Sequence, residues 1–474
     1  MKTLKLLVLL FLFSNNSFSQ CYSKIVSYSR NYIALQTDGT LWSKGTTFDR
    51  RLLGFGDVPA SAEFAQIGTD NNWTENISIT SENIFAIKTD GTLWVWGRIT
   101  TGGSAGLGTF DELDYITPTQ VGTDTNWAKV SQGIAFTLGI KTDGTLWAWG
   151  INSGGRLGIA NTDDSYKTSI PIQVGTESNW SNVFTGLTSL AFAIKTDGTL
   201  WSWGNNGLYL GYPNATASNN YRSPKQVGTD TWQTIAVGLN GPMIDGIKTD
   251  GTLWGWGHSV FGTYRFGDGS SSYTSEFPIQ IGTASDWKEI CLSQGTTMGL
   301  KTNGTRWGWG RNTTGQQMGI GTGVSGGFIA VPTQLGDDTD WKKLSIDLDQ
   351  GYGEGIKENN SLYHWGVTNT NLIYPLPTLF SLNNCTLGTS DFETNPITTY
   401  PNPTTDFLHI RFNQTFGQNA EINLFNQLGQ KLLLQNAETV NQEIALDLKN
   451  YVSGVYFLSL KINGQVYKTK IIKN

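Results

Sequence analysis

Residues 141–150 read Lys-Thr-Asp-Gly-Thr-Leu-Trp-Ala-Trp-Gly, and this decapeptide decides the fold because it recurs along the chain. Each copy begins with a lysine or, once, a glutamine: Gln36, Lys88, Lys141, Lys195, Lys248, Lys301 and Lys357. Successive copies start 52 to 56 residues apart, which makes seven units. A fixed spacing of this length indicates an array of equivalent structural units.

Each decapeptide predicts a β-hairpin. Asp-Gly between two apolar runs favours a tight turn, because glycine adopts positive φ without strain. The residue before the first lysine is always aliphatic and the one before that is Ala or Gly, so they lie on opposite strand faces. The two tryptophans after the turn share one face. We expect the small residues to leave room for indoles of an adjacent sheet, so that the units must stack.

A second element, Val/Ile-Gly-Thr-Asp-x-x-Trp, recurs between the decapeptides. It supplies Trp73, Trp127, Trp180, Trp232, Trp287 and Trp341. The two elements together contain all 18 tryptophans of the chain. A residue type confined to fixed repeat positions indicates packing, since individual binding roles would scatter it.

Each unit contains four strand-like runs, which in the unit around Lys141 are residues 118–121, 128–131, 135–142 and 145–150. Short strands joined by many turns leave exposed edges unless the sheets close into a ring. The sequence therefore predicts an all-β fold, a seven-bladed β-propeller of four-stranded blades over residues 20–385.

The two ends of the repeat region point to a closed ring. Tyr22 takes the tryptophan position of the second element, and Cys21 and Cys385 fall on the same phase of the repeat. We interpret the first and last strands as two parts of one split blade. In an oxidising compartment a Cys21–Cys385 disulfide could latch the ring, the alternative being two unpaired thiols. Cys291 is expected to be a small buried residue.

Residues 1–19 are typical of a secretory signal peptide. Lys2 and Lys5 precede an apolar run from Leu6 to Phe13, and small residues at 17–19 suggest cleavage near Gln20. A lipid anchor on Cys21 is the alternative. The apolar run is too short to cross a membrane, and no later segment reaches that length.

The composition changes after Trp365, beyond which no tryptophan occurs. Residues 386–397 are expected to form a linker, and residues 398–474 a small antiparallel, β-sandwich-like domain. Two apolar-alternating runs flank Asn463-Gly464, a pair that favours a hairpin turn. Alternate residues of the first run are predicted to cover a core: Tyr456, Leu458, Leu460 and Ile462.

The repeat region resembles the regulator of chromosome condensation repeat family, on residues 143–158 above all. The resemblance covers about residues 21–385 and implies a seven-bladed propeller. The family's Gly-Gln-Leu-Gly segment is altered here to Gly-Arg-Leu-Gly at residues 155–158. The eukaryotic founder exchanges nucleotide on a small GTPase at chromatin, partners that a secreted protein does not meet. The chain is more similar to secreted bacterial members, which implies protein binding.

The tail resembles the C-terminal sorting domain of the type IX secretion system. Several short motifs follow one another in the family's order, and the residues that carry them are Tyr400, Pro401, Asn402, Pro403, Gly454, Val455, Tyr456, Lys468 and Lys470. The resemblance implies export across the outer membrane of a Gram-negative cell, followed by release or attachment to its surface. An ordinary accessory β domain is the alternative.

Few residues suggest catalysis or a cofactor. The chain has three histidines, His258, His364 and His409, which are too dispersed for a metal cluster or a catalytic triad in the propeller. Residues 20–390 carry 23 basic and 31 acidic side chains, which disfavours nucleic acid as a partner. The aspartates of the repeated turns are expected to be structural. A carbohydrate-active enzyme using a pair of non-repeating loop carboxylates stays open.

The segments that follow each Trp-Gly differ freely in sequence at nearly constant length, as expected of loops presented by a rigid frame. They carry side chains of the types enriched in binding hot spots: Arg98, Tyr115, Arg156, Tyr166, Tyr209, Tyr212, Tyr221, His258, Phe261, Tyr264, Arg265 and Arg311. We predict a monomeric scaffold, without a cofactor and without enzymatic activity, that binds an extracellular protein or glycan. The alternatives are relaxed selection on surface loops, and a spacer or adhesion role.

Overall fold

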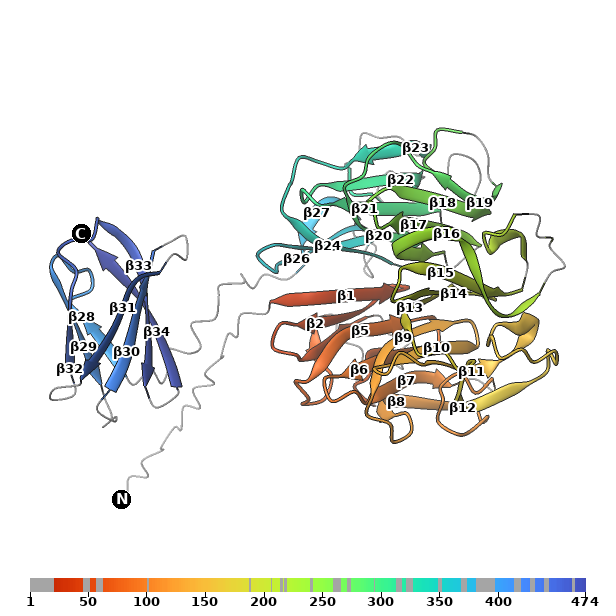
Figure 1. Ribbon diagram of the computed structural model, residues 1–474, viewed down its shortest axis with the longest axis horizontal. Coiled ribbons are helices and arrows are strands. Elements are labelled where there is room, and N and C mark those ends of the chain that lie inside the picture. Colours follow the sequence, from red (N-terminus) through yellow and green to blue (C-terminus); the bar gives the residue numbers. More distant parts are fainter. Residues whose placement is uncertain are drawn as a thin grey trace, which may run out of the picture. The chain divides into compact units, whose positions relative to one another are not determined.

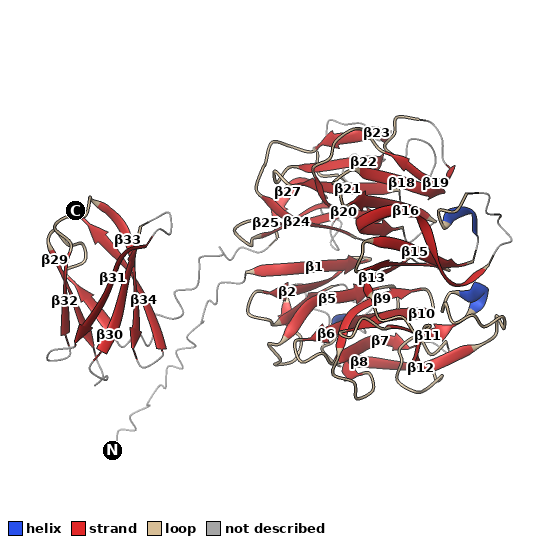
Figure 2. Ribbon diagram, in the orientation of Figure 1, coloured by secondary structure: helices blue, strands red, loops and turns tan. Residues whose placement is uncertain are grey.

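The structure is a computed structural model and is almost entirely β-sheet (Figures 1 and 2). It describes residues 21–45, 52–56, 63–99, 102–186, 189–205, 207–213, 216, 220–238, 242–258, 266–270, 274–293, 295–312, 318–320, 327–347, 352–367, 373–380, 397–412, 419–426, 431–438, 443–462 and 465–474. One compact unit spans Gln20–Cys385, and a second contains Thr386–Asn474. No described helix is long and apolar enough to cross a membrane.

The first unit is built from antiparallel sheets in chain order. Its first half contains β1 (Tyr22–Tyr28), β2 (Asn31–Gln36), β3 (Leu41–Lys44) and β4 (Ala65–Gln66); β5 (Trp73–Ile79), β6 (Asn83–Lys88), β7 (Leu93–Ile99) and β8 (Leu113–Gln120); β9 (Trp127–Gly133), β10 (Phe136–Lys141), β11 (Leu146–Ile151) and β12 (Lys167–Gln173); and β13 (Trp180–Thr185), β14 (Leu190–Lys195) and β15 (Thr199–Gly204). Short 3-10 helices cover Ser153–Gly155 (η2) and Gly207–Tyr209 (η3).

The second half continues the same order. It contains β16 (Tyr221–Val237), β17 (Met243–Lys248), β18 (Leu253–His258) and β19 (Thr274–Gln280); β20 (Trp287–Ser293), β21 (Thr296–Lys301), β22 (Arg306–Asn312) and β23 (Gly327–Gln334); and β24 (Trp341–Ile346), β25 (Gly353–Lys357), β26 (Leu362–Val367) and β27 (Ile373–Leu379). The long strand β16 pairs with β15 up to Thr231 and with β17 from Trp232 onward. It thereby closes one group of four strands and opens the next, so the pairings define seven groups of four.

The groups form a ring. The first strand of each group contacts the first strand of the next, from β1 and β5 around to β20 and β24. At the junction of the two ends β1 contacts β24 and β25, and the Tyr22 N–H donates to the Asn360 carbonyl at 3.0 Å. The predicted all-β propeller is confirmed.

The predicted split blade is wrong. β1 pairs with β2 and β27 pairs with β26, so the first and last sheets each have four strands from one continuous segment. A group begins at the tryptophan of the second element and ends just before the next one. The chain enters and leaves the ring at that boundary, so no blade needs strands from both ends. For the same reason the predicted run at 118–121 overlaps the end of β8, which belongs to the preceding sheet.

The repeated turns have the predicted structural role. In the unit of residues 141–150, Thr145 Oγ1 donates to Asp143 Oδ1 at 2.6 Å and accepts from Trp147 Nε1 at 2.8 Å. The hydrogen bonds from Thr145 lower the pKa of the Asp143 carboxyl. The same Trp-Thr-Asp chain occurs at Asp38, Asp90, Asp197 and Asp250. These carboxylates are fixed as hydrogen-bond acceptors of the turns.

The repeat lysine is held between two indoles and a carboxylate. Lys141 Nζ lies 3.7 Å from the ring centre of Trp147 and 5.1 Å from that of Trp127, and it pairs with Asp124 at 3.0 Å. Corresponding contacts surround Lys88, Lys195, Lys248, Lys301 and Lys357. Cation–π and ion-pair contacts therefore fix the lysine that starts most of the decapeptides.

Tryptophan packing follows the prediction in part. A Cβ on Gly139 of β10 would lie 2.6 Å from Trp127 Cζ3, but Trp127 is on β9 of the same sheet. The expectation that these small residues receive an indole of the adjacent sheet is therefore wrong. The short side chain is needed because the indole at the start of the first strand folds over the neighbouring strand.

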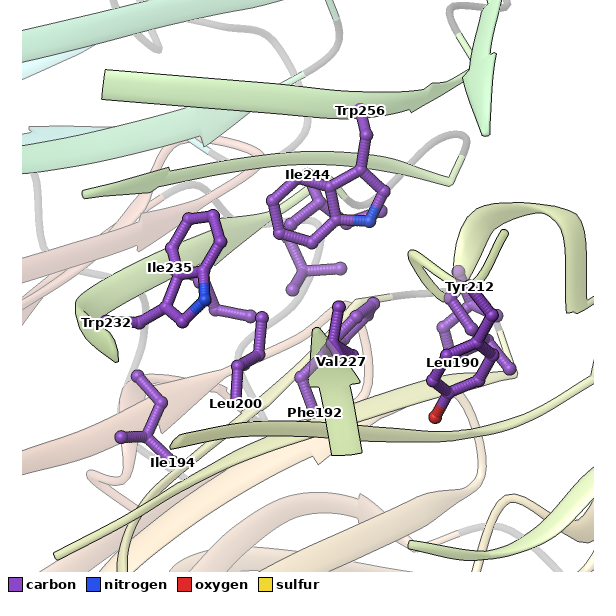
Figure 3. Close-up of a cluster of buried hydrophobic side chains, with 12 residues drawn as sticks. Leu190, Phe192, Ile194, Leu200, Tyr212, Val227, Trp232, Ile235, Ile244 and Trp256 are labelled. Atoms are coloured by element: carbon purple, nitrogen blue, oxygen red, sulfur yellow. The ribbon is translucent and has the colours of Figure 1, made fainter. Parts of the chain in front are cut away.

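Adjacent sheets interlock through a different glycine. Trp203 Nε1 donates to the Arg156 carbonyl in the loop of the preceding group at 3.0 Å, and a Cβ on Gly158 would lie 2.7 Å from this nitrogen. Trp96 and Trp256 donate to carbonyls of the preceding loop in the same way. Figure 3 shows Phe192 and Ile194 of one group beside Trp232 and Trp256 of the next, within one buried cluster.

The junction between the last and first groups is packed differently. Lys44 replaces the second tryptophan of its decapeptide, and its Nζ lies 4.7 Å from the ring centre of Phe380. Phe380 in turn stacks on His364 at 4.1 Å. Burial lowers the pKa of the Lys44 ammonium and lowers that of His364 to about 4. Only residues 368–372 separate β26 from β27, so this group lacks the long loop that receives an indole elsewhere.

The second unit has two sheets. One contains β28 (Ile397–Tyr400), β29 (Phe407–Phe412) and β32 (Glu443–Asp447). The other has the order β31 (Lys431–Glu438), β30 (Asn419–Phe425), β33 (Gly454–Ile462) and β34 (Gln465–Lys473). Both contribute to one buried cluster, in which Tyr456, Leu458 and Leu460 take part as predicted. The side chain of Ile462 lies outside the described residues.

Candidate binding surface

The propeller has two chemically different ends. Antiparallel pairing places every Asp-Gly turn at one end of its sheet and every connection between third and fourth strands at the other. The turn end repeats the same hydrogen-bonded structure from group to group. The loop end carries the residues that do not repeat, so it is the end where a specific partner could be distinguished.

Two predicted contact residues are buried. Arg156 is 9% exposed and donates through Nε to the Ser153 carbonyl and through its guanidinium to the Ile134 carbonyl. Tyr212 is 3% exposed, and its hydroxyl bonds Ser202 and the Lys225 carbonyl. Burial lowers the pKa of Arg156 and raises that of Tyr212. Their assignment to the binding surface is corrected, since both side chains fasten loops to the strands beneath.

Three other predicted residues take part in two separate contacts, Tyr209 with His258 and Tyr221 with Lys225, and both tyrosines pack against the same buried cluster. The ring centres of Tyr209 and His258 are 6.0 Å apart, and His258 Nδ1 lies 3.1 Å from Thr274 Oγ1. Tyr221 lies on β16, where Lys225 Nζ is 4.7 Å from its ring centre. Partial burial, together with the nearby Glu276 carboxylate, raises the pKa of the Tyr209 phenol. The Tyr209–His258 pair and the Tyr221–Lys225 pair are together called the aromatic-basic cluster below.

The remaining predicted residues are separate. Arg98 is exposed and lies 4.0 Å from Glu112. Tyr115 and Tyr166 are half-buried against the cores of their groups. Arg311 is half-buried on β22. Phe261, Tyr264 and Arg265 lie outside the described residues, as do Cys385 of the predicted disulfide and the side chain of Lys468.

Sequence reasoning missed one surface pair at the ring junction. The Arg30 guanidinium lies 5.9 Å from the ring centre of Tyr352, and the Arg30 N–H donates to Asp347 Oδ2 at 2.9 Å. Ser29 and Arg30 both have positive φ, of 46° and 67°, which costs energy in non-glycine residues and is often retained at functional sites. The lack of a glycine in this hairpin turn is the sequence feature that could have drawn attention to the pair.

Buried carboxylates were also missed. Asp245 and Glu354 occupy the second-strand position that holds a large apolar residue in the other groups: Ile33, Phe85, Leu138, Phe192 and Met298. Thr297 Oγ1 donates to Asp245 at 2.8 Å, and Ser27 Oγ donates to Glu354 at 3.0 Å. Aligning the seven copies at this position would have exposed both exceptions.

The non-repeating loop carboxylates are engaged in local contacts. Glu112 faces Arg98, and Asp164 pairs with Arg222 at 2.8 Å. Asp163 accepts from Ser165, and this hydrogen bond lowers its pKa, whereas a general acid needs a raised one. Within the described ranges no group of three His, Cys, Asp or Glu side chains could hold a metal ion.

Comparisons with known proteins identify both parts of the chain. Residues 143–191 and 127–156 match models of the regulator of chromosome condensation (RCC1) repeat. Residues 398–474 match the secretion system C-terminal sorting domain. The chain thus contains RCC1 repeats followed by a sorting domain, as the motifs predicted.

Individual relatives are distant. The ultraviolet-B receptor UVR8 of Arabidopsis thaliana is 24% identical over 331 residues, which is 69% of this chain and 72% of the receptor. The E3 ubiquitin-protein ligase HERC2 of Homo sapiens is 22% identical over 58% of this chain but only 6% of its own length. That match does not extend to the rest of the ligase.

Solved structures support the propeller fold. Human WBSCR16 superimposes with a TM-score of 0.58 at 16% identity, covering 70% of this chain and 85% of that one. Yeast RCC1 (Prp20), in its complex with Kap60, gives a TM-score of 0.58 at 19% identity, with coverage of 71% and 80%. At these identities the similarity concerns the fold alone.

Proposed function

We propose that the propeller is a binding scaffold that recognises an extracellular protein or glycan through its loop end. The observation that carries this proposal is the contrast between the two ends. The turn end repeats one hydrogen-bonded design, whereas the loop end presents the aromatic-basic cluster, in which a histidine, His258, follows the repeated Trp-Gly in one of the seven copies alone. Tyrosine supplies large contact area and hydrogen bonding at low conformational cost.

The test begins by capturing the partner on immobilised full-length protein from the medium in which the organism grows. Tyr209→Ala and His258→Ala are then expected to weaken the captured complex about tenfold each, or roughly 1.4 kcal/mol, if they form part of its centre. Glu358→Ala, an exposed change at the turn end, is the matched control and should bind as the wild type does. Equal binding by all three variants would refute the site, provided that their thermal unfolding is unchanged.

We also propose that residues 398–474 direct export through the type IX secretion system, which places the protein outside a Gram-negative cell or on its surface. The match of residues 398–474 to the sorting-domain model supports the proposal. Deleting residues 398–474 is expected to move the protein from the medium or cell surface to the periplasm, in a host with this system. Export of the truncated chain at wild-type level would contradict it.

A further inference from the structure

The second unit exposes an apolar strip on the outer face of its four-stranded sheet. The strip consists of Phe425, Leu432, Val455, Phe457 and Ile472. Phe457, Leu432 and Ile472 are 47%, 41% and 37% exposed. An exposed Leu or Phe alone is ordinary, but a group of them on one face of a small domain is typical of an interaction surface.

Strand register places four of these residues side by side on one face, and Leu432 lies at the irregularity where β31 passes Phe425. Phe425 on β30 is directly opposite Phe457 on β33, and Val455 on β33 is opposite Ile472 on β34. Between them, Tyr456 and Leu458 point inward and are buried. Farther along the same outer face the residues become polar, at Ser459. A sheet with one solvated face should be polar there throughout, so this end is apolar on both faces.

The sorting-domain motifs meet at the same end of the sheet. Asn402 of the Tyr-Pro-Asn-Pro motif donates through Nδ2 to the Lys470 carbonyl at 2.8 Å, and its Oδ1 accepts from the Ile472 N–H at 2.8 Å. The Thr404 N–H donates to the Ile472 carbonyl at 2.8 Å. The motif thus covers the free edge of β34 beside the strip and holds Ile472 in place. The segment that begins at Gly454 supplies Val455 and Phe457.

The strip is flanked by positive charge. Lys431 pairs in register with Phe425, and Lys470 pairs with Phe457; both lysines are exposed. The register partners of the strip include no acidic residue. A surface that is apolar in the middle and basic at the sides complements an apolar groove with an acidic rim.

The outer face of the other sheet is different. The Tyr400 hydroxyl donates to Glu443 at 2.7 Å, and His409 Nδ1 lies 2.7 Å from the same carboxylate. Arg411 completes the group at 3.5 Å from Glu443. The polar side chains of this face satisfy one another, and Phe407 is its one apolar residue among the large exposed ones, so in the part that the structure describes this face has no apolar strip like that of the four-stranded sheet.

We propose that the apolar strip is the surface by which the export machinery holds the sorting domain, and that the receiving surface is an apolar groove with an acidic rim. This inference rests on the proposed role of residues 398–474 in export. It goes further by naming the face that is recognised and the chemistry of its partner.

The test compares exported fractions of full-length variants in a host with a type IX system. Phe457→Ser combined with Ile472→Thr is expected to lower the exported fraction at least tenfold. Phe407→Ser is the matched control, because Phe407 is 42% exposed on β29 of the other sheet. Should the double variant fail to fold, charge reversal at Lys431 and Lys470 replaces it, with Lys449→Glu as its control; the same loss of export is expected.

Each outcome separates the two proposals. Wild-type export of the strip variants, together with failure of the deletion variant, would overturn the strip and leave the export role intact. Wild-type export of the deletion variant would overturn the export role. Hydroxyl-radical labelling of the purified full chain tests whether another part of the protein covers the strip. Phe457 should label as strongly as Phe407, and strong protection of Phe457 alone would overturn the proposal.

Discussion

Trp203→Ala is expected to lower the free energy of unfolding by about 3–5 kcal/mol, the usual cost of truncating a fully buried large aromatic residue. Trp203 has no exposed surface, it packs against Gly158, and its indole nitrogen donates to the Arg156 carbonyl. Alanine removes the contact between two groups as well as the hydrogen bond. Because every group needs both neighbours to bury its faces, the loss should appear as one lowered cooperative transition in urea.

Trp201→Ala provides the matched control in the same decapeptide. Trp201 is half-buried, and its nitrogen donates at 3.0 Å to Thr199 within its own turn. Its truncation should cost clearly less, since it is only half-buried and its indole nitrogen bonds within its own turn. A Trp203→Phe variant should fall in between, because it keeps a six-membered aromatic ring but loses the hydrogen bond, worth about 1 kcal/mol, and the part of the indole that packs on Gly158. Equal losses for Trp201→Ala and Trp203→Ala would contradict the interlocking role.

The sequence predicts the propeller because repetition makes each local signal redundant. A single Asp-Gly-Thr-Leu-Trp is a weak hairpin signal, but seven copies at nearly constant spacing leave few architectures that bury their tryptophans. The strand pairing at the two ends of the repeat region was harder to predict. The phase shared by Cys21 and Cys385 is real in the sequence, yet it marks the boundary between groups and not a strand shared by both ends.

The sequence predicts that the small strand residues pack against tryptophans, but not which tryptophan each of them contacts. Alternation along a strand shows that Gly139 faces an indole, but it cannot show whether that indole comes from the same sheet or the next. The glycine that does receive the neighbouring indole, such as Gly158, lies in a loop without periodicity. Sequence patterns report the faces of strands, whereas contacts made by loops depend on the assembled ring.

The candidate binding surface also could not be predicted fully from residue types. Residue type alone placed Arg156 and Tyr212 on the binding surface, since arginine and tyrosine are common in hot spots. Both side chains can also bury their stems while bonding backbone carbonyls, and here they do so. The Arg30–Tyr352 contact was not predicted, because the two residues belong to the first and last groups of the chain and meet only when the ring closes.

The ring junction should make the stability of the protein depend on pH through Glu354. This side chain is buried at the boundary between the last and first groups, where Ser27 Oγ donates to Oε1 and no partner of Oε2 is found among the residues that the structure describes. Burial, and secondarily the Asp347 carboxylate, raises the pKa of Glu354 well above its ordinary value, although hydrogen bonds from Ser27 and Ser345 act in the opposite direction. Burial, and secondarily the Glu354 carboxylate, raises the pKa of the neighbouring Tyr32 phenol.

The sign of the effect follows from proton linkage. Above the ordinary pKa of a glutamate, the unfolded chain has released this proton while the folded chain still holds it. Unfolding therefore releases a proton, and the free energy of unfolding falls as pH rises, until the folded-state pKa is passed. The contribution of Glu354 is thus fully present in acid and is lost toward neutral and alkaline pH.

Glu354→Gln should remove this dependence, because the amide keeps an acceptor for Ser27 and carries no proton that folding must retain. We expect the variant and the wild type to have similar stability near pH 4, and the variant to become progressively more stable than the wild type toward pH 8, in denaturant titrations at each pH. Glu358→Gln, at an exposed turn, should follow the wild type throughout. A constant difference between Glu354→Gln and the wild type at every pH would show that this carboxyl keeps its ordinary pKa in the fold. In that case the junction would be held by its aromatic packing and backbone contacts, and not by a proton retained between the first and last groups.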